Sequence, residues 1–288
     1  MAVQHARFEQ AMKIVIELED TFGDIMRKAS RGTAMTGDQL AKASGIGADR
    51  LAALQADKAQ ASEDEARAVA RALKLDPGKL ADIALRRWTP PVMEQPQHIG
   101  HQVNTPQPSN GYFLILQEQK AAAFVDPGGA PANIISTLRR SPVNLQYILL
   151  THRHADHCDA LAPVREAFPS ARPVIHRLDA PALGTRARDS IGINDGDALP
   201  FGDGEIRLRH TPGHTDGSSC FIYKGSIFTG DTLFAGSVGG LFGDDFGYLD
   251  LLHGIETKLF CLPEDTVVLP GHGPPSTIGE ERAHNPFF

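Results

Sequence analysis

THRHADHCD, the run at residues 151–159, carries more information than any other part of the chain. His152, His154, Asp156 and His157 are side chains of the kinds that bind divalent metals, and they fall close together in this run. A polar loop with scattered histidines is the alternative interpretation. A purely structural loop has little use for three imidazoles and a carboxylate at such a spacing, so the HxHxDH pattern predicts a metal site.

The run directly follows an apolar segment, Tyr-Ile-Leu-Leu at 147–150, which is predicted to be a buried strand. In an extended backbone, residues i and i+2 point to the same side, so His152 and His154 can hold one ion. Asp156 and His157 follow in the turn and can face a second ion. Neutral imidazoles and carboxylates suit zinc, and also iron or manganese.

Three further residues of the same kinds lie beside glycines later in the chain. Glycine lets the backbone turn sharply and present a neighbouring side chain from a loop. Each of the three follows a strand-like run, so they can complete the ligand set. They are His214 in TPGHT (211–215), Asp231 in FTGDTLF (228–234) and His272 in LPGHG (269–273).

Asp231 is expected to bridge two ions, with one carboxylate oxygen on each. Two ions about 3.5–4 Å apart can share a hydroxide and polarise a substrate carbonyl, so the reaction needs no serine or cysteine nucleophile. Asp156 and Asp231 are the residues expected to act in catalysis as well as in metal binding.

The ordered series of motifs resembles the metallo-β-lactamase superfamily over roughly residues 100–288. The motifs are VDPG (125–128), HxHxDH (152–157), PGHT (212–215), GDTLF (230–234) and PGHG (270–273). The resemblance implies an α+β fold built as an αββα sandwich. It implies that His152, His154 and His214 bind the first metal, that Asp156, His157 and His272 bind the second, that Asp231 bridges them, and that Asp126 supports the ligand loop.

Within the superfamily the chain looks most like the glyoxalase II group, because of TPGHTDGS, FTGDTLF and TIGEERAHNPF. That group hydrolyses thioesters, above all S-acylglutathione. A sister branch, the persulfide dioxygenases, holds one iron with two histidines and one aspartate, which would be His152, His214 and Asp231 in this chain.

Two departures from glyoxalase II argue against glutathione as part of the substrate. The lysine and the tyrosine that hold glutathione in that group correspond to Gly240 and Phe242 here. The chain also ends at Phe288, without the helical extension that supplies further basic contacts. The pocket is therefore expected to take a smaller or more apolar acyl group.

The first part of the chain has a different composition and is predicted to be helical. It is rich in Ala, Leu, Lys, Asp and Glu, and apolar residues at helical spacing predict a first helix over 5–30. Thr36, Ser62 and the pair Asp76-Pro77 are predicted to begin later helices.

Three prolines in the polar segment RRWTPPVMEQPQH predict an extended linker. Beyond the linker, short apolar strands alternate with helices, as in a layered α/β or α+β domain. We therefore predict a helical domain at 1–85, a linker at 86–98 and a metal-binding domain at 99–288.

TGDQLAKASGIGADRLAAL (36–54) resembles the helix-turn-helix of the phage-repressor-like family, with residues 48–56 in the place of the recognition helix. The surface that would read DNA is poor in positive charge, because Asp49 and Asp57 lie in or beside that helix. The alternatives to DNA binding are dimerisation and covering the mouth of the active site.

The composition of the 288 residues, with 41% hydrophobic and 22% charged, is ordinary for a soluble protein. A net charge of −7 does not favour coating nucleic acid or anionic membranes. No apolar run approaches the ~18 residues that span a bilayer, and no signal peptide is evident, so a cytoplasmic location is expected. Cys220 and Cys261 are expected in the core, and Cys158 is either a packing residue or a metal-binding thiolate.

Together these features predict a metallo-hydrolase that holds two zinc ions per chain, or iron or manganese, and attacks a small-molecule acyl thioester or ester with a metal-bound hydroxide. The first alternative is a mononuclear iron persulfide dioxygenase. The second is a DNA-binding regulator whose metal domain senses a ligand. Besides the substrate, the candidate partners are DNA, through the helical domain, and a second copy of the chain; no membrane partner is expected.

Overall fold

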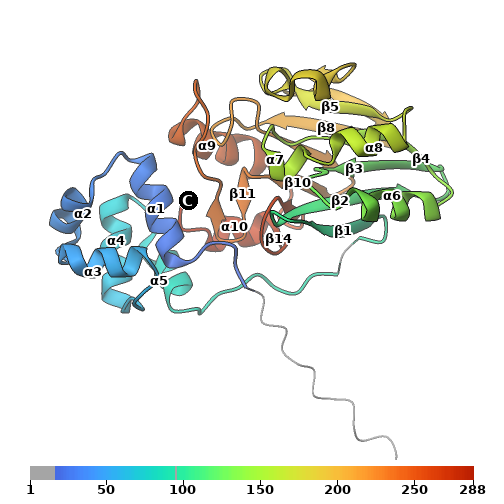
Figure 1. The fold of residues 1–288 in the computed structure, drawn as a ribbon. Coiled ribbons are helices and arrows are strands. Elements are labelled where there is room, and N and C mark those ends of the chain that lie inside the picture. Colours follow the sequence, from blue (N-terminus) through green and yellow to red (C-terminus); the bar gives the residue numbers. More distant parts are fainter. Residues whose placement is uncertain (1–16, 95) are drawn as a thin grey trace, which may run out of the picture.

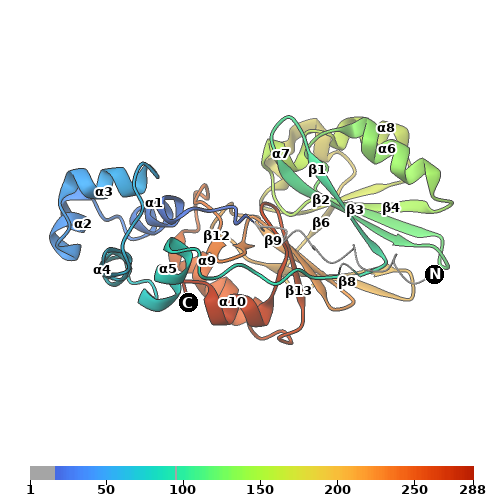
Figure 2. The ribbon, with the colours of Figure 1, turned by 90° about the horizontal axis from the view of Figure 1, so that it is seen from below.

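The computed structural model describes residues 17–94 and 96–288. Five helices lie at one end of the molecule, and two β-sheets with further helices lie at the other (Figure 1 and Figure 2). Among the described residues, no helix is long and apolar enough to cross a membrane.

The five helices begin where local hydrogen bonds can cap them. Thr36 and Ser62 each form a capping box, in which the hydroxyl accepts from the third helical N–H and that residue's side chain accepts in return. Asp76 caps its helix ahead of Pro77, so these three predicted starts are confirmed. The helices are α1 (Phe22–Gly32), α2 (Gly37–Ser44), α3 (Ala48–Gln55), α4 (Glu63–Leu73) and α5 (Pro77–Ala84).

The first helix differs from the one predicted over 5–30. Residues 1–16 lie outside the described part of the chain, and residues 17–21 are not helical. Thr21 is extended, and its hydroxyl accepts from the backbone N–H of Asp24 at 3.1 Å. This cap ends the helix in the N-terminal direction, which apolar spacing alone does not reveal.

The helices share one hydrophobic core with part of the second sheet and its helices. Buried side chains of the helices, such as Ile25, Met26 and Leu80, belong to the same cluster as Leu233, Val238 and Leu251. Backbone contacts join the two parts as well, because the Asp76 N–H donates to Pro286 O at 2.8 Å. The helical segment is therefore packed against the rest of the chain.

The predicted linker has no helix or strand in its described residues, but it is anchored. Trp88 is buried, and its indole N–H donates to Glu280 Oε2 at 3.0 Å. Its ring stacks on His284 with centroids 5.1 Å apart. These contacts tie the connection to the C-terminal helix, while the domain boundaries at 85 and 98 stay a prediction.

Two six-stranded sheets form the centre of the larger part. The first has the order β1-β2-β3-β4-β5-β6, with β3 to β6 parallel. Its strands are β1 (Ile99–Asn104), β2 (Ser109–Leu116), β3 (Ala121–Val125), β4 (Asn144–Leu149), β5 (Arg172–His176) and β6 (Ile191–Ile193).

The second sheet has the order β14-β13-β10-β9-β8-β7, and a short hairpin of β11 and β12 lies beside it. Its strands are mainly antiparallel, with β10 and β13 parallel. The strands are β7 (Ala198–Phe201), β8 (Gly204–His210), β9 (Ser219–Tyr223), β10 (Ser226–Gly230), β11 (Leu233–Phe234), β12 (Ser237–Val238), β13 (Val267–Pro270) and β14 (Ser276–Thr277).

The two sheets face each other across one apolar layer, and each has helices on its outer face. Leu149 from the first sheet and Phe228 from the second belong to the layer between them. Helices α6 (Pro131–Arg140) and α8 (Leu161–Ala167) pack on the first sheet, and α9 (Tyr248–Gly254), the π-helix η2 (Ile255–Leu259) and α10 (Ile278–His284) pack on the second. The order helix–sheet–sheet–helix matches the predicted αββα sandwich.

Strand ends place the predicted ligands at one edge of this sandwich. The strand predicted at 147–150 is β4, and the HxHxDH run follows it directly, with Ala155–Cys158 forming the short helix α7. Asp231 follows β10 and His272 follows β13.

All three cysteines are free; Cys158 and Cys220 are buried, but Cys261 is exposed at the end of η2, so its expected core position is wrong.

A buried carboxyl group fastens α10 to the hairpin of β11 and β12. Glu281 Oε2 accepts from the Gly236 N–H and from Asn285 Nδ2, each at 2.9 Å. Burial raises the pKa of Glu281 to about 7. The folded protein therefore holds this proton at a higher pH than the unfolded chain, in which the pKa is near 4.5.

This shift predicts a pH-dependent contribution to stability. The stabilisation from protonated Glu281 is complete below about pH 4.5 and is lost as the pH rises through about 7. Between these limits, the wild type should lose about 3 kcal/mol of unfolding free energy relative to Glu281→Gln. Urea unfolding followed by Trp88 fluorescence measures the difference. Exposed Glu264→Gln is the control, and parallel pH curves for wild type and Glu281→Gln would contradict the prediction.

Candidate metal centre

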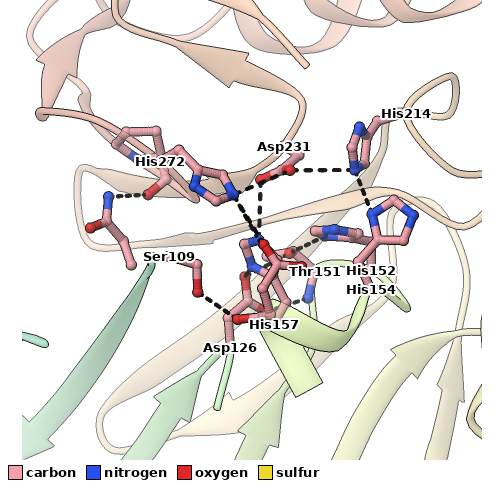
Figure 3. A network of polar contacts seen from close by, with 12 residues as sticks. Ser109, Asp126, Thr151, His152, His154, His157, His214, Asp231 and His272 are labelled. Atoms are coloured by element: carbon pink, nitrogen blue, oxygen red, sulfur yellow. Dashed lines mark hydrogen bonds and ion pairs between the residues drawn. The ribbon is translucent and has the colours of Figure 1, made fainter. Parts of the chain in front are cut away.

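All seven predicted ligands meet at the sandwich edge, and Figure 3 labels each of them except Asp156. They form three overlapping groups whose nitrogen and oxygen atoms lie within 4.8 Å of one another. The first group is His152, His154 and His214, and the second group is Asp156, His157 and His272; a third set, His152, His157 and Asp231, overlaps both. The sequence thus predicted the membership of the cluster, although the side chains come from four separate loops.

Two rings of the first group, those of His152 and His214, have Nε2 turned toward the cluster by a hydrogen bond at Nδ1. His214 Nδ1 lies 2.7 Å from Gly240 O, which can only accept, so Nδ1 carries the proton and Nε2 presents its lone pair. His214 Nε2 lies 2.9 Å from His154 Nδ1. Two imidazole nitrogens converge here on one point.

His152 is oriented by a chain of hydrogen bonds that starts at Asp126. The Thr151 hydroxyl donates to Asp126 Oδ2 at 2.7 Å and lies 3.0 Å from His152 Nδ1. The only hydroxyl hydrogen is used in the bond to the carboxylate, so the hydroxyl oxygen accepts from His152 Nδ1–H, and Nε2 keeps its lone pair. His152 Nε2 is buried and has no hydrogen-bond partner among the described residues.

Asp126 holds the ligand loop from below. Besides the Thr151 hydroxyl, it accepts from the Thr151 N–H at 2.8 Å and from His157 Nδ1 at 2.9 Å. These bonds fix the start of the HxHxDH run and the ring of His157. This arrangement agrees with the supporting role expected for Asp126.

Asp231 lies between the first and the second group. Its Oδ2 is 3.4 Å from His214 Nε2 and 3.5 Å from His272 Nε2, and its Oδ1 is 3.3 Å from His157 Nε2. The second group is compact, with Asp156 Oδ2 at 3.4 Å from His157 Nε2 and 3.3 Å from His272 Nε2. The carboxylate of Asp231 is therefore placed to serve both groups.

The protonation of the histidines differs between the groups. Burial lowers the pKa of His152 well below its usual value and lowers that of His214 to about 4. Burial also opposes protonation of His272, but its contacts with Asp156 and Asp231 raise the pKa to about 10. The imidazoles of the first group are therefore neutral. In the second group the carboxylates favour a positively charged neighbour.

These observations fit divalent metal ions. Neutral imidazoles with free lone pairs are ligands for zinc and related metals. His152 supplies one, because its Nε2 atom is buried and has no hydrogen-bond partner among the described residues. The carboxylates of Asp156 and Asp231 require nearby positive charge, which dications supply. The donor set holds only nitrogen and oxygen, so it suits zinc, iron and manganese alike.

Asp179 is a supporting residue that the sequence did not reveal. It is buried and accepts from Arg153 N–H at 2.9 Å, from the Thr215 hydroxyl at 2.7 Å and from Gly217 N–H at 2.9 Å. It thereby joins the HxHxDH loop to the loop of His214. No motif surrounds Asp179 in the sequence, so only its contacts identify it.

Two glycines permit close approach of the ligand loops. A Cβ atom at Gly128 would lie 1.4 Å from Asp156 O, and one at Gly239 would lie 1.7 Å from Asp231 O. Any side chain at either position would displace the backbone of a ligand. Gly128 belongs to the VDPG motif singled out in the sequence.

Three further histidines and Cys158 lie outside the three groups. His176 and His210 stack on each other with centroids 3.9 Å apart, and His284 stacks on Trp88. Cys158 is buried beside the ligand loop, and its thiol lies 3.0 Å from His154 O. Its pKa is raised by burial to about 11, so its environment is that of a packing residue.

A family model described as "Metallo-beta-lactamase superfamily" matches residues 104–272. Among known relatives, the hydroxyacylglutathione hydrolase GloC of Haemophilus influenzae is 32% identical over 192 residues, which cover 61% of this chain and 91% of that protein.

Solved structures resemble the chain over about the same share. BLEG-1 B3 metallo-beta-lactamase is 35% identical with a TM-score of 0.59, over 66% of this chain and 98% of that one. TTHA1623, solved in a di-iron-bound form, is 30% identical with a TM-score of 0.55, over 66% and 100%. ETHE1 from Myxococcus xanthus is 25% identical with a TM-score of 0.58, over 65% and 83%.

The position of Asp231 predicts the result of removing its carboxylate. Asp231→Ala should lose most bound metal and nearly all activity, because both ligand groups lose their shared partner. Removing a residue that only supports a metal ligand lowers metal affinity about 10–100-fold. The loss in Asp231→Ala should be larger.

Metal content after dialysis measures this prediction, and circular dichroism checks that the helices stay folded. Exposed Asp203→Ala, which removes a carboxylate paired with Lys224, is the matched control. Full metal occupancy in Asp231→Ala would show that the carboxylate does not bridge.

Proposed function

Since the chain belongs to the metallo-beta-lactamase superfamily, we propose that it is a metal-dependent hydrolase that cleaves a small acyl thioester or ester. The observation that carries the proposal is the position of Asp231 between two complete ligand groups. The similarity to a hydroxyacylglutathione hydrolase supports a thioester as the bond that is cleaved.

The proposed ligands for one ion are His152, His154 and His214, and those for the other are Asp156, His157 and His272, with Asp231 shared. When bound, the two ions would supply a water molecule activated at neutral pH and would polarise the substrate carbonyl. Asp126 and Asp179 keep the ligand loops in register, so the imidazoles need little reorganisation when substrate binds.

The surface beside Gly240 and Phe242, which we call the mouth of the site, favours a small substrate. Phe242 is 52% exposed, and its ring lies edge-on to His154 and His214, with centroids 5.3 and 5.4 Å apart. Gly240 adds no side chain beside it. An apolar ring and a glycine offer no charge-assisted hydrogen bond to glutathione at these two positions, as the resemblance to glyoxalase II led us to expect.

S-lactoylglutathione should therefore be a poor substrate. Two missing charge-assisted hydrogen bonds correspond to roughly 10²–10⁴ in kcat/KM relative to a smaller acyl thioester. Gly240→Lys with Phe242→Tyr should recover part of the loss; a Cβ at Gly240 would meet only the movable ring of Phe242, at 3.0 Å.

Steady-state kinetics on both thioesters test this, with each single variant as a control for the pair. A wild-type kcat/KM of ~10⁶ M⁻¹s⁻¹ on S-lactoylglutathione, well within the range of efficient enzymes, would show that the pocket accepts glutathione.

The alternative is a persulfide dioxygenase with one iron on His152, His214 and Asp231. The fold similarity to ETHE1 is compatible with it. The second group of ligands, compact around His157 and His272, favours two ions instead. Metal analysis separates the two: two ions per chain support the hydrolase, and one iron supports the dioxygenase.

The helix-turn-helix resemblance of the helical segment stays a prediction, and its contacts favour a role other than DNA reading. Arg50 of α3 is held by Glu65 through two contacts, at 2.7 and 2.8 Å, and also donates to Gln60 O. Asp57 accepts from Gly23 N–H at 3.2 Å and from the Thr21 hydroxyl at 2.8 Å. Asp57 therefore caps the start of α1, and its carboxylate is engaged by these two donors.

General DNA affinity should be weak, with a Kd on the order of 10⁻⁵ M or higher at physiological salt, because phosphate contacts dominate such binding and Arg50 is already paired. Exposed Asp49→Asn should tighten binding by a few-fold. Asp64→Asn, which removes an exposed carboxylate from α4, is the control, and fluorescence anisotropy at several salt concentrations is the measurement. A tight, sequence-specific site would instead support the regulator.

Dimer formation and a cytoplasmic location likewise stay predictions.

A further inference from the structure

The segment from Glu19 to Arg31 contacts three loops around the metal centre. Glu19 Oε1 lies 3.9 Å from His272 Nδ1, at one end of the mouth. Lys28 Nζ donates to Val238 O at 2.7 Å, beside the hairpin of β11 and β12. The guanidinium of Arg31 lies over the ring of Phe242, 5.3 Å from its centroid, at the other end. The helical segment therefore forms one side of the mouth.

Of the two cations in this segment that face the site, one is already engaged. Lys28 pairs with Asp20, donates to a backbone carbonyl and lies 4.8 Å from the centre of the Phe234 ring. Arg31 is exposed and has no ion pair or side-chain hydrogen bond with any residue between 17 and 288 that the structure describes. Its five N–H donors are available to a ligand.

Phe242 connects this guanidinium to the metal ligands. One side of its ring is covered by Arg31, and its edge contacts involve His154 and His214. Arg153, the other arginine beside Phe242, is neutralised by Asp179 at 3.0 Å and lies 4.0 Å from Asp216. Arg31 is thus separated from the first ligand group by about the width of one aromatic ring.

We propose that Arg31 binds a carboxylate of the substrate, while Phe242 contacts the short chain between that carboxylate and the scissile carbonyl. The inference rests on the proposed hydrolase function and names its substrate class: a small acyl thioester or ester with one carboxylate several bonds from the reacting carbon. A planar guanidinium binds a carboxylate through two parallel hydrogen bonds. One such group suits a small monoanion.

The test uses two compounds that differ in one charge, the S-succinyl thioester of N-acetylcysteamine and its methyl ester. Wild type, Arg31→Gln and Arg31→Lys are compared as metal-loaded proteins. Arg27→Gln is the matched control, because Arg27 lies on the same helix but its guanidinium is engaged by Asp24 and Gln55 within the helical segment. A thioether analogue of the succinyl compound gives a Kd by calorimetry that does not depend on turnover.

Arg31→Gln should lower kcat/KM for the succinyl thioester by about 10- to 100-fold, mainly through KM, and leave the methyl ester nearly unchanged. Arg31→Lys should recover part of the difference, and Arg27→Gln should change neither substrate. The analogue should lose a similar factor in affinity with Arg31→Gln.

Equal effects of Arg31→Gln on the two compounds, or no effect on either, would overturn the proposal, because only a carboxylate contact discriminates between them. If the metal-loaded wild type cleaves neither compound, the proposed reaction fails. The calorimetric Kd then still decides whether Arg31 binds the carboxylate, since Arg31→Gln must weaken the analogue for the proposal to stand.

Discussion

Three carboxylates that meet at one edge of the sandwich set the main constraint on this structure. Asp126, Asp156 and Asp231 lie among imidazoles in a mostly buried space. Buried charge is costly unless opposite charge or hydrogen-bond donors compensate it. Asp126 is compensated by Thr151 and His157, whereas Asp156 and Asp231 draw positive charge to the imidazole of His272, whose pKa they raise to about 10. A pair of dications would supply this positive charge directly, so the cluster suits divalent metal ions.

The ligands come from distant parts of the sequence, and the strands bring them together because several strands end at this edge. β4, β10 and β13 all end at the same edge, and the loops that follow them carry His152, Asp231 and His272. The apolar layer between the sheets packs β4, β10 and β13 together through Leu149, Phe228 and Leu269. Asp179 then joins two of the loops through buried hydrogen bonds, so the ligand geometry depends on side chains that touch no ligand atom.

The helical segment is packed against the part of the chain that holds the metal ligands. It shares a hydrophobic core with the second sheet, and the connection at Trp88 is fastened to α10. Within that segment the polar groups that would face DNA are committed elsewhere, Arg50 to Glu65 and Asp57 to the start of α1. The residues that face the metal centre are Glu19, Lys28 and Arg31. These contacts place one side of the helical segment beside the metal centre.

The sequence by itself determined the features that depend on neighbours a few positions away. The helix starts at Thr36, Ser62 and Asp76 follow from hydrogen bonds within one turn, and the HxHxDH run follows from side-chain spacing along one strand end. The membership of the ligand cluster could be predicted because each ligand is a histidine or an aspartate in a short motif at the end of a strand-like run. Tertiary structure alone decided the features that depend on packing between distant segments. These include the support from Asp179, the capping of α1 by Asp57, the exposed Cys261 and the placement of Arg31 over Phe242. Each arises from side chains tens to hundreds of positions apart, whose meeting depends on how the sheets and helices pack and leaves no local pattern in the chain.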